Sequence, residues 1–411
     1  MADAQLTPPA LTADLPGTGG SLRQSPEDFV VEEIPIYLPC GSGEHVLFEI
    51  EKRGLTTFSA IERIAHALQL SPRLIGCAGL KDARALTRQW LSVERTTPEA
   101  VLALQIPGLR ILQADRHRNR LKIGHLRGNR FAIRVRDTVD DALPRALAIL
   151  DVLQRRGLPN AFGPQRFGLH RNTHLLGRAL LTQDAPGLLH YLLGDPHDDD
   201  APNEYRARAL ADEGDYVAAL AAWPHAHGSV EHRVLTALAH GQTPEQALRR
   251  LPPHLKRLYV AAFQASLFNR LLAARVSRIE ALETGDLAVK HANGAFFLVE
   301  DAAIEQPRAD ALEISASAPL YSHRVRLAQG APGERERDLL REEGLTLESF
   351  RVPGADLRGD RRPLRAPLSD VSAESDGDGG LWLRFALPSG SYATSLLAEV
   401  TKAERMADLD V

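Results

Sequence analysis

The end of the chain carries one strand followed by one helix, and this order limits the possible folds more than any other feature. The segment LWLRFAL (381–387) has the pattern of a strand, and YATSLLAEVTKAER (392–405) has that of a helix. A single strand needs a partner for its backbone N–H and C=O groups. We therefore expect this strand to complete a sheet formed by the N-terminal part of the chain, so that the middle of the chain is an insertion.

The N-terminal part of the chain contains both strand and helix patterns. Strands are predicted at 45–53 and 88–95, two short strands around a Gly-containing turn at 119–137, and helices at 56–70 and 141–157. The strands follow one another in hairpins more often than in βαβ units. This order predicts an α+β fold with a mixed, mostly antiparallel sheet flanked by helices.

Changes in composition along the chain predict the domain boundaries. Residues 1–24 lack a basic start followed by an apolar core, so we interpret them as a flexible leader and not as a signal peptide. The stretch 353–380 is rich in Pro, Gly and Asp and is predicted to be a linker. We expect residues 25–156 and 356–411 to form one domain, interrupted by an inserted α/β domain at 157–355.

Several classes of protein are excluded by what the sequence lacks. The two cysteines, Cys40 and Cys77, are not in a CxxC pair, so neither a disulfide framework nor a zinc site is indicated. No apolar run is long enough to span a bilayer, and no nucleotide-binding loop or hydrolase motif is present. The acidic run 198–200 is interpreted as a solvated loop, so no metal site is predicted.

A basic stretch extends from Arg116 to Arg136, although the whole chain has a net charge of −4. Eight Arg or Lys residues and no acidic residue lie in it. On a hairpin, alternate residues share one face, so Arg118, Arg120 and Lys122 are predicted to form a stripe. Such a stripe suits a phosphate backbone, and a solvated strand face is the alternative.

Asp82 is the candidate catalytic residue. It follows the small, apolar segment LIGCAGL and Lys81, which places it at the end of a buried element. A carboxylate at this point can act as a nucleophile or as a general acid or base. Lys81, Arg84 and Arg88 are expected to keep it ionised, and Gln89 to hydrogen-bond nearby. The alternative is an Asp that caps the turn KDARA through its own backbone.

Four further positions could serve structure or binding. Asn129 is either a turn residue or a contact to the polar edge of a base, and Phe131 is either a core residue or a stacking platform. Arg166 lies in a Gly- and Pro-rich loop that is either a binding loop or a structural turn. Ser391 is expected to cap the closing helix, which leaves Tyr392 for packing or for stacking.

Seven segments, taken together and in order, resemble the TruD family of tRNA pseudouridine synthases, which act on uridine 13. They lie between residues 25 and 399 and read SPEDFVVEE, GEHVLFEIEK, AGLKDARALTRQW, LRGNRFAIRV, PNAFGPQRFG, AFQASLFNRL and LPSGSYATSLLAE. A single short motif of this kind has little specificity, whereas seven in family order are specific.

The resemblance implies that Asp82 is the catalytic carboxylate, acting on a uridine that has left its stack. It also implies that Phe29, Asn129 and Tyr392 contact the target nucleotide. The family often has Phe where this chain has Tyr392, which keeps the stacking but adds a hydroxyl that needs a partner. Leu80 replaces a Gln of the family and removes a side-chain hydrogen bond.

The remaining assignments also follow from the resemblance. Further substrate-site residues are Phe131, Lys81, Glu27 and Gln89, and RNA-backbone contacts are assigned to Arg118, Arg120, Lys122, Arg84 and Arg166. The reaction is expected to need neither a metal nor an organic cofactor. The implied partner is tRNA, with no membrane and no obligatory protein partner, and the protein is expected to be a cytoplasmic monomer.

Two other functions remain open from the sequence. A non-catalytic RNA-binding protein would bind tRNA without forming pseudouridine. A hydrolase acting on a nucleoside or sugar would need a second carboxylate close to Asp82, and Glu27 and Glu94 are the nearest candidates in the sequence.

Overall fold

The computed structural model describes residues 6–224, 229–355 and 357–403, and residues 1–5 of the predicted leader lie outside them. The chain divides into two compact units. Unit 1 consists of Met1–Pro9 and Ala161–Arg365, and unit 2 of Ala10–Asn160 and Ala366–Val411. The boundaries between the units lie after residues 160 and 365, whereas the composition of the sequence predicted them after 156 and 355.

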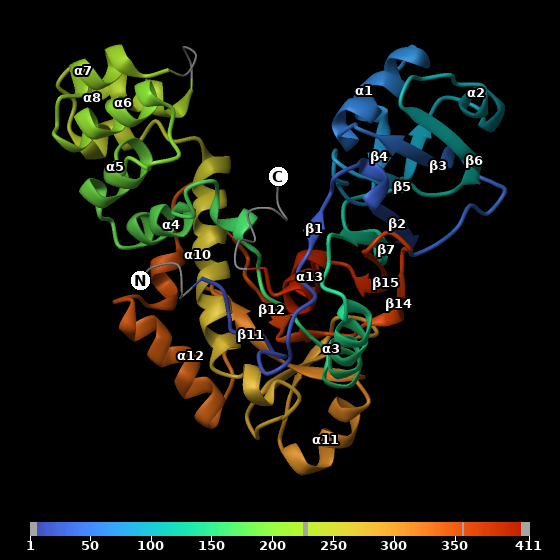
Figure 1. Cartoon of the computed structure of the whole chain (residues 1–411). Coiled ribbons are helices and arrows are strands. Elements are labelled where there is room, and N and C mark those ends of the chain that lie inside the picture. The colour runs from blue at the N-terminus through green and yellow to red at the C-terminus, as the bar shows by residue number, and fades with distance from the viewer. Residues whose placement is uncertain (1–5, 225–228, 356, 404–411) are drawn as a thin grey trace. The chain divides into compact units, whose positions relative to one another are not determined.

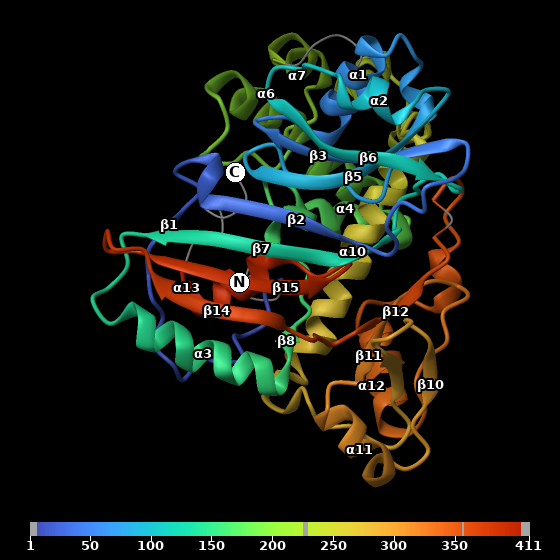
Figure 2. The same ribbon diagram turned by 90° about the vertical axis from the view of Figure 1, so that its right-hand side faces the viewer.

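Unit 2 is built on a nine-stranded sheet within the described residues (Figures 1 and 2). Its main path runs β14-β15-β7-β2-β5-β3-β6, with β1 added to β7 and β4 added to β5. The pair β2–β5 is parallel and the other pairs are antiparallel, which confirms the predicted mixed, mostly antiparallel sheet. The strands are β1 (Ser21–Leu22), β2 (Phe29–Pro35), β3 (His45–Arg53), β4 (Ile75–Cys77), β5 (Leu86–Glu94), β6 (Leu109–His117), β7 (Leu126–Arg136), β14 (Ser369–Ser375) and β15 (Leu381–Pro388).

Helices cover the sheet of unit 2. The apolar side of α1, together with α2, packs on one face of β3. This face carries the buried residues Val46, Phe48 and Ile50, because alternate residues of a strand point to the same side. At the other edge, α3 packs against β14 and α13 packs against α3. The helices are α1 (Thr57–Ala67), α2 (Pro98–Leu102), α3 (Ala142–Arg156) and α13 (Ala393–Thr401), with short 3₁₀ turns η2 (Pro26–Asp28) and η3 (Pro72–Leu74).

The closing strand completes the N-terminal sheet, as the sequence predicted. Over its whole length β15 pairs with β7, from Leu381 opposite Val135 to Pro388 opposite Gly128. Figure 2 shows these two strands side by side, with β15 between β7 and the edge strand β14. Segments far apart in the sequence therefore share one set of main-chain hydrogen bonds.

The predicted flexible leader is wrong for residues 10–24. Leu11 and Thr12 are buried, and their backbone N–H groups donate to the carboxylate of Glu399 on α13 at 2.7 and 3.1 Å. Thr18 N–H donates to the carbonyl of Val400, and β1 pairs with β7. The Gly- and Pro-rich composition resembles that of a disordered leader, but here the backbone is held by partners from the other end of the chain.

Two further predictions of local structure are wrong. The first short strand expected near 119–122 is absent, since residues 118–125 form the loop between β6 and β7. The linker expected at 353–380 instead contains edge strands, including β14, whose side chains are mostly exposed. Edge strands tolerate polar residues because only one side of their backbone is paired, so their composition is similar to that of loops.

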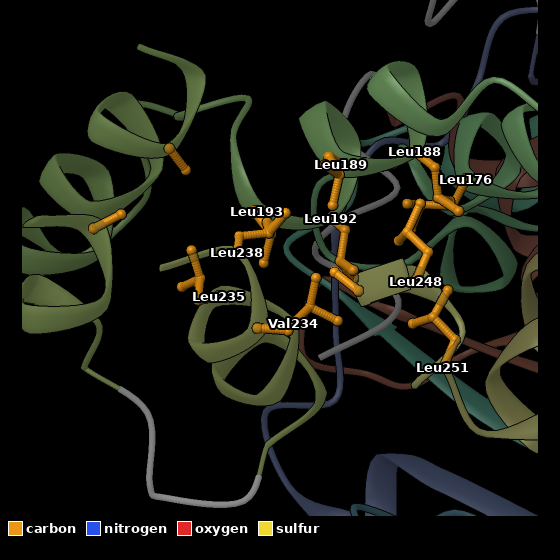
Figure 3. Close-up of a cluster of buried hydrophobic side chains, with 14 of the residues drawn as sticks. Leu176, Leu188, Leu189, Leu192, Leu193, Val234, Leu235, Leu238, Leu248 and Leu251 are labelled. Carbon is orange, nitrogen blue, oxygen red and sulfur yellow. The ribbon is translucent and has the colours of Figure 1, made fainter. Parts of the chain in front are cut away.

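Unit 1 combines helices with a four-stranded antiparallel sheet in the order β10-β9-β11-β12. Its long helix α10 packs on α4 and against β11. Helices α4–α9 enclose their own apolar core, which includes Leu189, Leu192 and Leu238 (Figure 3). The strands are β9 (Leu287–Lys290), β10 (Phe296–Leu298), β11 (Ile314–Leu320) and β12 (Asp360–Pro363).

The helices of unit 1 are α4 (Thr173–Leu181), α5 (Ala185–Leu193), α6 (Pro202–Asp212), α7 (Tyr216–Ala222), α8 (Val230–Ala239), α9 (Pro244–Leu248), α10 (Pro253–Ala273), α11 (Ala302–Asp310) and α12 (Gly330–Glu342). Three 3₁₀ turns are η4 (Pro164–Phe167), η5 (Val276–Arg278) and η6 (Leu347–Phe350). Short strands β8 (Leu158–Pro159) and β13 (Arg365–Ala366), where the chain leaves and re-enters unit 2, pair with each other. Among the described residues, no helix is both long and apolar enough to cross a membrane.

Candidate active site

Asp82 lies in unit 2, on the loop that connects β4 with β5. The loop follows the buried end of β4, and the side chain of Asp82 remains 35% exposed. Its carboxylate makes a polar contact through each of its two oxygens. The Arg23 guanidinium lies 3.0 Å from Oδ2, and the backbone N–H of Arg84 donates to Oδ1 at 3.0 Å. The carboxylate is thus held in place and is still accessible.

The cation beside Asp82 differs from the prediction. Lys81 and Arg88 were expected to keep it ionised, but Lys81 pairs with Glu33 at 3.0 Å and Arg88 with Glu51 at 2.9 Å. Arg84 contributes its backbone N–H. The ion pair comes from Arg23, whose backbone is in the left-handed region with a φ of 59°. Adjacent residues in an extended loop point in different directions, so sequence neighbours need not be spatial partners.

Lys81 contacts two residues that lie opposite each other on the neighbouring strands β2 and β7. Its ammonium lies 3.0 Å from Glu33 Oε2 on β2 and donates to Asn129 Oδ1 on β7 at 2.8 Å. Glu33 and Lys81 are both buried, and burial raises the pKa of Glu33 while the charge of Lys81 opposes that rise. Since an ammonium only donates, the oxygen of the Asn129 amide must face Lys81 and its NH₂ group must face away.

Gln89 supports this loop from the core. It is fully buried on β5 and accepts a hydrogen bond from the hydroxyl of Thr57 at 3.0 Å. The same hydroxyl accepts from the backbone N–H of Lys81 at 2.9 Å. The side-chain NH₂ of Gln89 also donates to the backbone carbonyl of Gly79 in the loop at 3.5 Å. Gln89 therefore supports the loop through Thr57 and at Gly79, and not by touching Asp82.

Three phenylalanines form a row beneath Arg23. The Arg23 guanidinium lies 4.3 Å from the centre of the Phe29 ring, which meets Phe131 edge-on at 6.5 Å. Phe131 in turn stacks on Phe385 at 5.1 Å. All three rings are buried, so Phe131 is a core residue. The ring of Phe29 makes a cation–π contact with Arg23, the same cation that pairs with Asp82.

The turn after β15 lies beside Asn129. Leu387 on β15 is opposite Asn129, and the backbone N–H of Ser389 donates to the carbonyl of Arg127. Gly128 permits this close approach, because a Cβ there would clash with the carbonyl of Leu387. The N-cap of α13 is Tyr392, 39% exposed, and not Ser391 as predicted, because the turn is one residue longer than expected.

The predicted basic stripe does not lie on a strand. Arg118, Arg120 and Lys122 are in the β6–β7 loop, where Arg118 and Lys122 are exposed. Arg120 donates to the backbone carbonyls of Arg73 and Ile75 at 2.6 and 3.1 Å. Of the neighbouring cations on β7, Arg130, Arg134 and Arg136 each pair with an Asp. The free positive charge of this region is therefore smaller than the sequence indicated.

The remaining predicted residues have other partners or positions. Glu27 is exposed and pairs with Arg53 at 2.5 Å, a contact that lowers the pKa of Glu27. Glu94 is at the far end of β5 from Asp82, about 26 Å along the strand for eight steps of about 3.3 Å. Arg166 belongs to unit 1, where its guanidinium lies over the Phe162 ring at 5.2 Å.

The acidic run 198–200 is only partly the solvated loop that was predicted. Asp198 and Asp199 are exposed, but the Asp200 side chain is 2% exposed. It pairs with His170 at 2.8 Å and approaches Arg208 at 3.5 Å. Among residues 6–224, 229–355 and 357–403, no group of three or more His, Cys, Asp or Glu is arranged to hold a metal ion.

Sequence reasoning missed two cations that bind the Asp82 loop, Arg23 and Lys52. Arg23 has no local signal, since its role depends on a contact with a distant loop. Lys52 does have a local signal. It follows Val46, Phe48 and Ile50 at every second position of β3, so the alternation of the strand places this lysine on the buried side.

Comparison with known proteins assigns the family. A profile of the family described as tRNA pseudouridine synthase D (TruD) matches residues 6–400. A tRNA pseudouridine synthase D of Geobacter metallireducens is 50% identical over 397 residues, covering 96% of this chain and 98% of the relative. One of Thermus thermophilus is 40% identical over 405 residues, covering 98% and 94%.

The fold agrees with this result. A crystal structure assigned to tRNA pseudouridine synthase D of Methanosarcina mazei superposes with a TM-score of 0.85 at 27% identity, covering 100% of this chain and 98% of that one. The chain belongs to the TruD family of tRNA pseudouridine synthases. The predicted family resemblance and fold class are therefore confirmed.

Proposed function

We propose that this protein isomerises uridine 13 of tRNA to pseudouridine, with Asp82 as the catalytic carboxylate. The observation that carries the proposal is the Asp82 carboxylate itself, exposed on its loop and held by Arg23 and by the Arg84 N–H. A carboxylate fixed in this way can act as a nucleophile. The family membership supports the same reaction and substrate.

The reaction balances without any external reagent. The bond between N1 of uracil and C1′ of ribose breaks, the ring turns, and a bond forms between C5 and C1′. The hydrogen on C5 leaves as a proton to water, and N1 takes up a proton from water, so the product is an isomer of the substrate. Asp82 assists by attacking either the uracil ring or the sugar, and the bond that it forms breaks again before the product leaves. No electron is gained or lost overall, so we propose that neither a metal nor an organic cofactor takes part.

Asn129 is proposed to recognise the base. Lys81 occupies the oxygen of its amide, so the outward side offers two N–H donors. Uracil presents carbonyl oxygens at positions 2 and 4, whereas cytosine replaces the second of these with an amino donor. We propose that Asn129 donates to a uracil carbonyl. The guanidinium of Arg23, supported by the buried ring of Phe29, and the ring of Tyr392 are proposed to provide flat surfaces at the site.

The wider substrate contacts are proposals of the same kind. Exposed Arg118 and Lys122, with Arg84 and Arg166, are assigned to tRNA phosphates. Asp82, Arg23, Phe29, Asn129 and Tyr392 all lie in one unit of one chain, which supports action as a monomer without an obligatory protein partner. The site of action is proposed to be the cytoplasm, because the substrate is tRNA.

The test is to map pseudouridine in unmodified tRNA after incubation with the protein, using release of tritium from C5 to measure the rate. Asp82→Asn should reduce the rate by at least about 1000-fold while leaving tRNA affinity unchanged. Asp151→Asn, on an exposed ion pair of α3, is the matched control. Normal turnover by Asp82→Asn would exclude the assigned role.

The alternatives give different results in this assay. A non-catalytic RNA-binding protein would bind tRNA and release no tritium. A hydrolase with a carboxylate pair would release free uracil. The positions of Glu27, paired with Arg53, and of Glu94, at the far end of β5, do not favour that second alternative.

A further inference from the structure

Lys52 is a buried lysine at the last inward-facing position of β3. It is 1% exposed and belongs to the same side of the strand as Val46, Phe48 and Ile50. Burying an ammonium group is costly unless its protons find acceptors. A lysine retained in such a place therefore needs an explanation from its contacts.

The ammonium of Lys52 meets three backbone carbonyl oxygens. It donates to Leu55 at 2.6 Å, to Asp82 at 2.8 Å and to Lys81 at 3.4 Å. A protonated lysine has three N–H donors, so each is used. Within the described part of the chain, no carboxylate forms an ion pair with it. Lys52 thus joins the β3–α1 turn to the two residues of the loop that carry the proposed catalytic group.

We propose that Lys52 is a positioning residue, which fixes the backbone of Lys81 and Asp82 so that the Asp82 carboxylate is presented in one orientation. The proposal rests on the function proposed above for Asp82. From the outer side, Arg23 and the Arg84 N–H hold the carboxylate. From the core side, Lys52 holds the peptide groups to which that carboxylate is attached.

The charge state of Lys52 then becomes important. Burial lowers the pKa of Lys52 from 10.5 to about 8, with the negative charge of Asp82 opposing the shift and the positive charge of Lys81 adding to it. Its partners on the neighbouring strands, Thr87 and Leu109, carry no charge. Above this pH the side chain becomes a neutral amine with two N–H donors for three carbonyls.

A purely structural role and a positioning role make different predictions. If Lys52 only stabilises the fold, its replacement changes the amount of folded protein and not the rate per folded molecule. If it positions Asp82, the chemical step slows while tRNA still binds. A displacement of about 1 Å of a catalytic group can slow a reaction about 100-fold.

The experiment compares Lys52→Met with wild-type protein and with Lys256→Met, a lysine on α10 of unit 1 that makes none of these contacts. Single-turnover tritium release, tRNA affinity and circular dichroism are measured for each. Lys52→Met should release tritium about 100-fold more slowly, with affinity within about twofold of wild type. A rate equal to that of Lys256→Met would overturn the proposal.

The pH profile is a second readout that does not depend on the Met variant folding. The wild-type single-turnover rate should fall as pH rises through about 8. Arginine stays protonated above this pH, so the single-turnover rate of Lys52→Arg should not fall there. A wild-type rate that stays constant through this range would also overturn the proposal.

The same set of proteins separates this proposal from the function on which it rests. If Asp82→Asn turns over normally, the assignment of Asp82 fails and Lys52 has no catalytic group to position. If Asp82→Asn is inactive and Lys52→Met is as fast as wild type, only the role of Lys52 fails.

Discussion

Glu33 and Asn129 lie directly opposite each other on the antiparallel strands β2 and β7, and one buried lysine, Lys81, contacts both. The strand register sets the distance between the carboxylate and the amide, and Lys81 comes from the loop of Asp82. The orientation of Asn129 is therefore determined by a charge pair in the core. This arrangement links the proposed base contact of Asn129 to the loop that carries the proposed catalytic carboxylate.

The variant Asn129→Asp tests the outward amide. Its carboxylate would still offer an oxygen to Lys81, but both N–H donors would be lost. We expect tritium release from tRNA to slow by about 10- to 100-fold, as for the loss of one or two hydrogen bonds in a buried site. Asn293→Asp, on an exposed turn of unit 1, is the control. An unchanged rate would mean that the Asn129 amide does not donate to the base.

Replacement of Arg23 tests the cation beside Asp82. Arg23→Met removes both the ion pair with Asp82 and the cation over the Phe29 ring. Arg23→Lys keeps a positive charge but loses the planar group that lies on the ring. We expect the single-turnover rate to fall in the order wild type, Lys variant, Met variant, with tRNA affinity changing less than the rate. Equal rates for the Lys and Met variants would contradict a role for the charge.

The salt dependence of tRNA binding should distinguish the three cations of the β6–β7 loop. Arg118 and Lys122 are exposed, so Arg118→Gln or Lys122→Gln should each reduce the slope of log affinity against log salt by about 0.7 to 0.9. Arg120→Gln should leave the slope closer to wild type, because its guanidinium already binds backbone carbonyls. Arg130→Gln, whose cation pairs with Asp370, is a second control.

Because the pKa of Lys52 is lowered, we expect stability to rise and activity to fall at alkaline pH. Its pKa is about 8 in the folded state and 10.5 as an unperturbed lysine, so the unfolded chain binds more protons between these values. The Lys52 contribution to the free energy of unfolding should therefore rise with pH in this range, by up to about 3 kcal/mol for a pKa difference of about 2.5.

Urea denaturation of wild type and of Lys52→Met at several pH values measures this contribution as the difference between the two proteins. As pH rises from about 8 towards 10.5, the free energy of unfolding of wild type should increase relative to that of Lys52→Met. Over the same range, wild-type turnover should fall. A parallel loss of stability and turnover in wild type, absent in the variant, would indicate unfolding and not loss of positioning.

Much of the fold follows from local patterns in the sequence. The alternation of Val46, Phe48 and Ile50 predicts β3, and the predicted helix at 141–157 corresponds to α3. The closing strand could be assigned to the N-terminal sheet because an isolated strand needs partners. The seven motifs also indicated the family and the candidate residue Asp82.

The polar contacts of the site could not be predicted in this way. Apolar periodicity reports which side of an element is buried, and it is encoded within a few residues. The partner of a charged group depends instead on which distant segments meet, as Arg23 meets Asp82 and Thr12 meets Glu399. The sequence alone thus determined many of the elements, the family and the candidate carboxylate. Only the tertiary structure decided which cations hold that carboxylate and its backbone, because those contacts form through space between segments that are far apart in the chain.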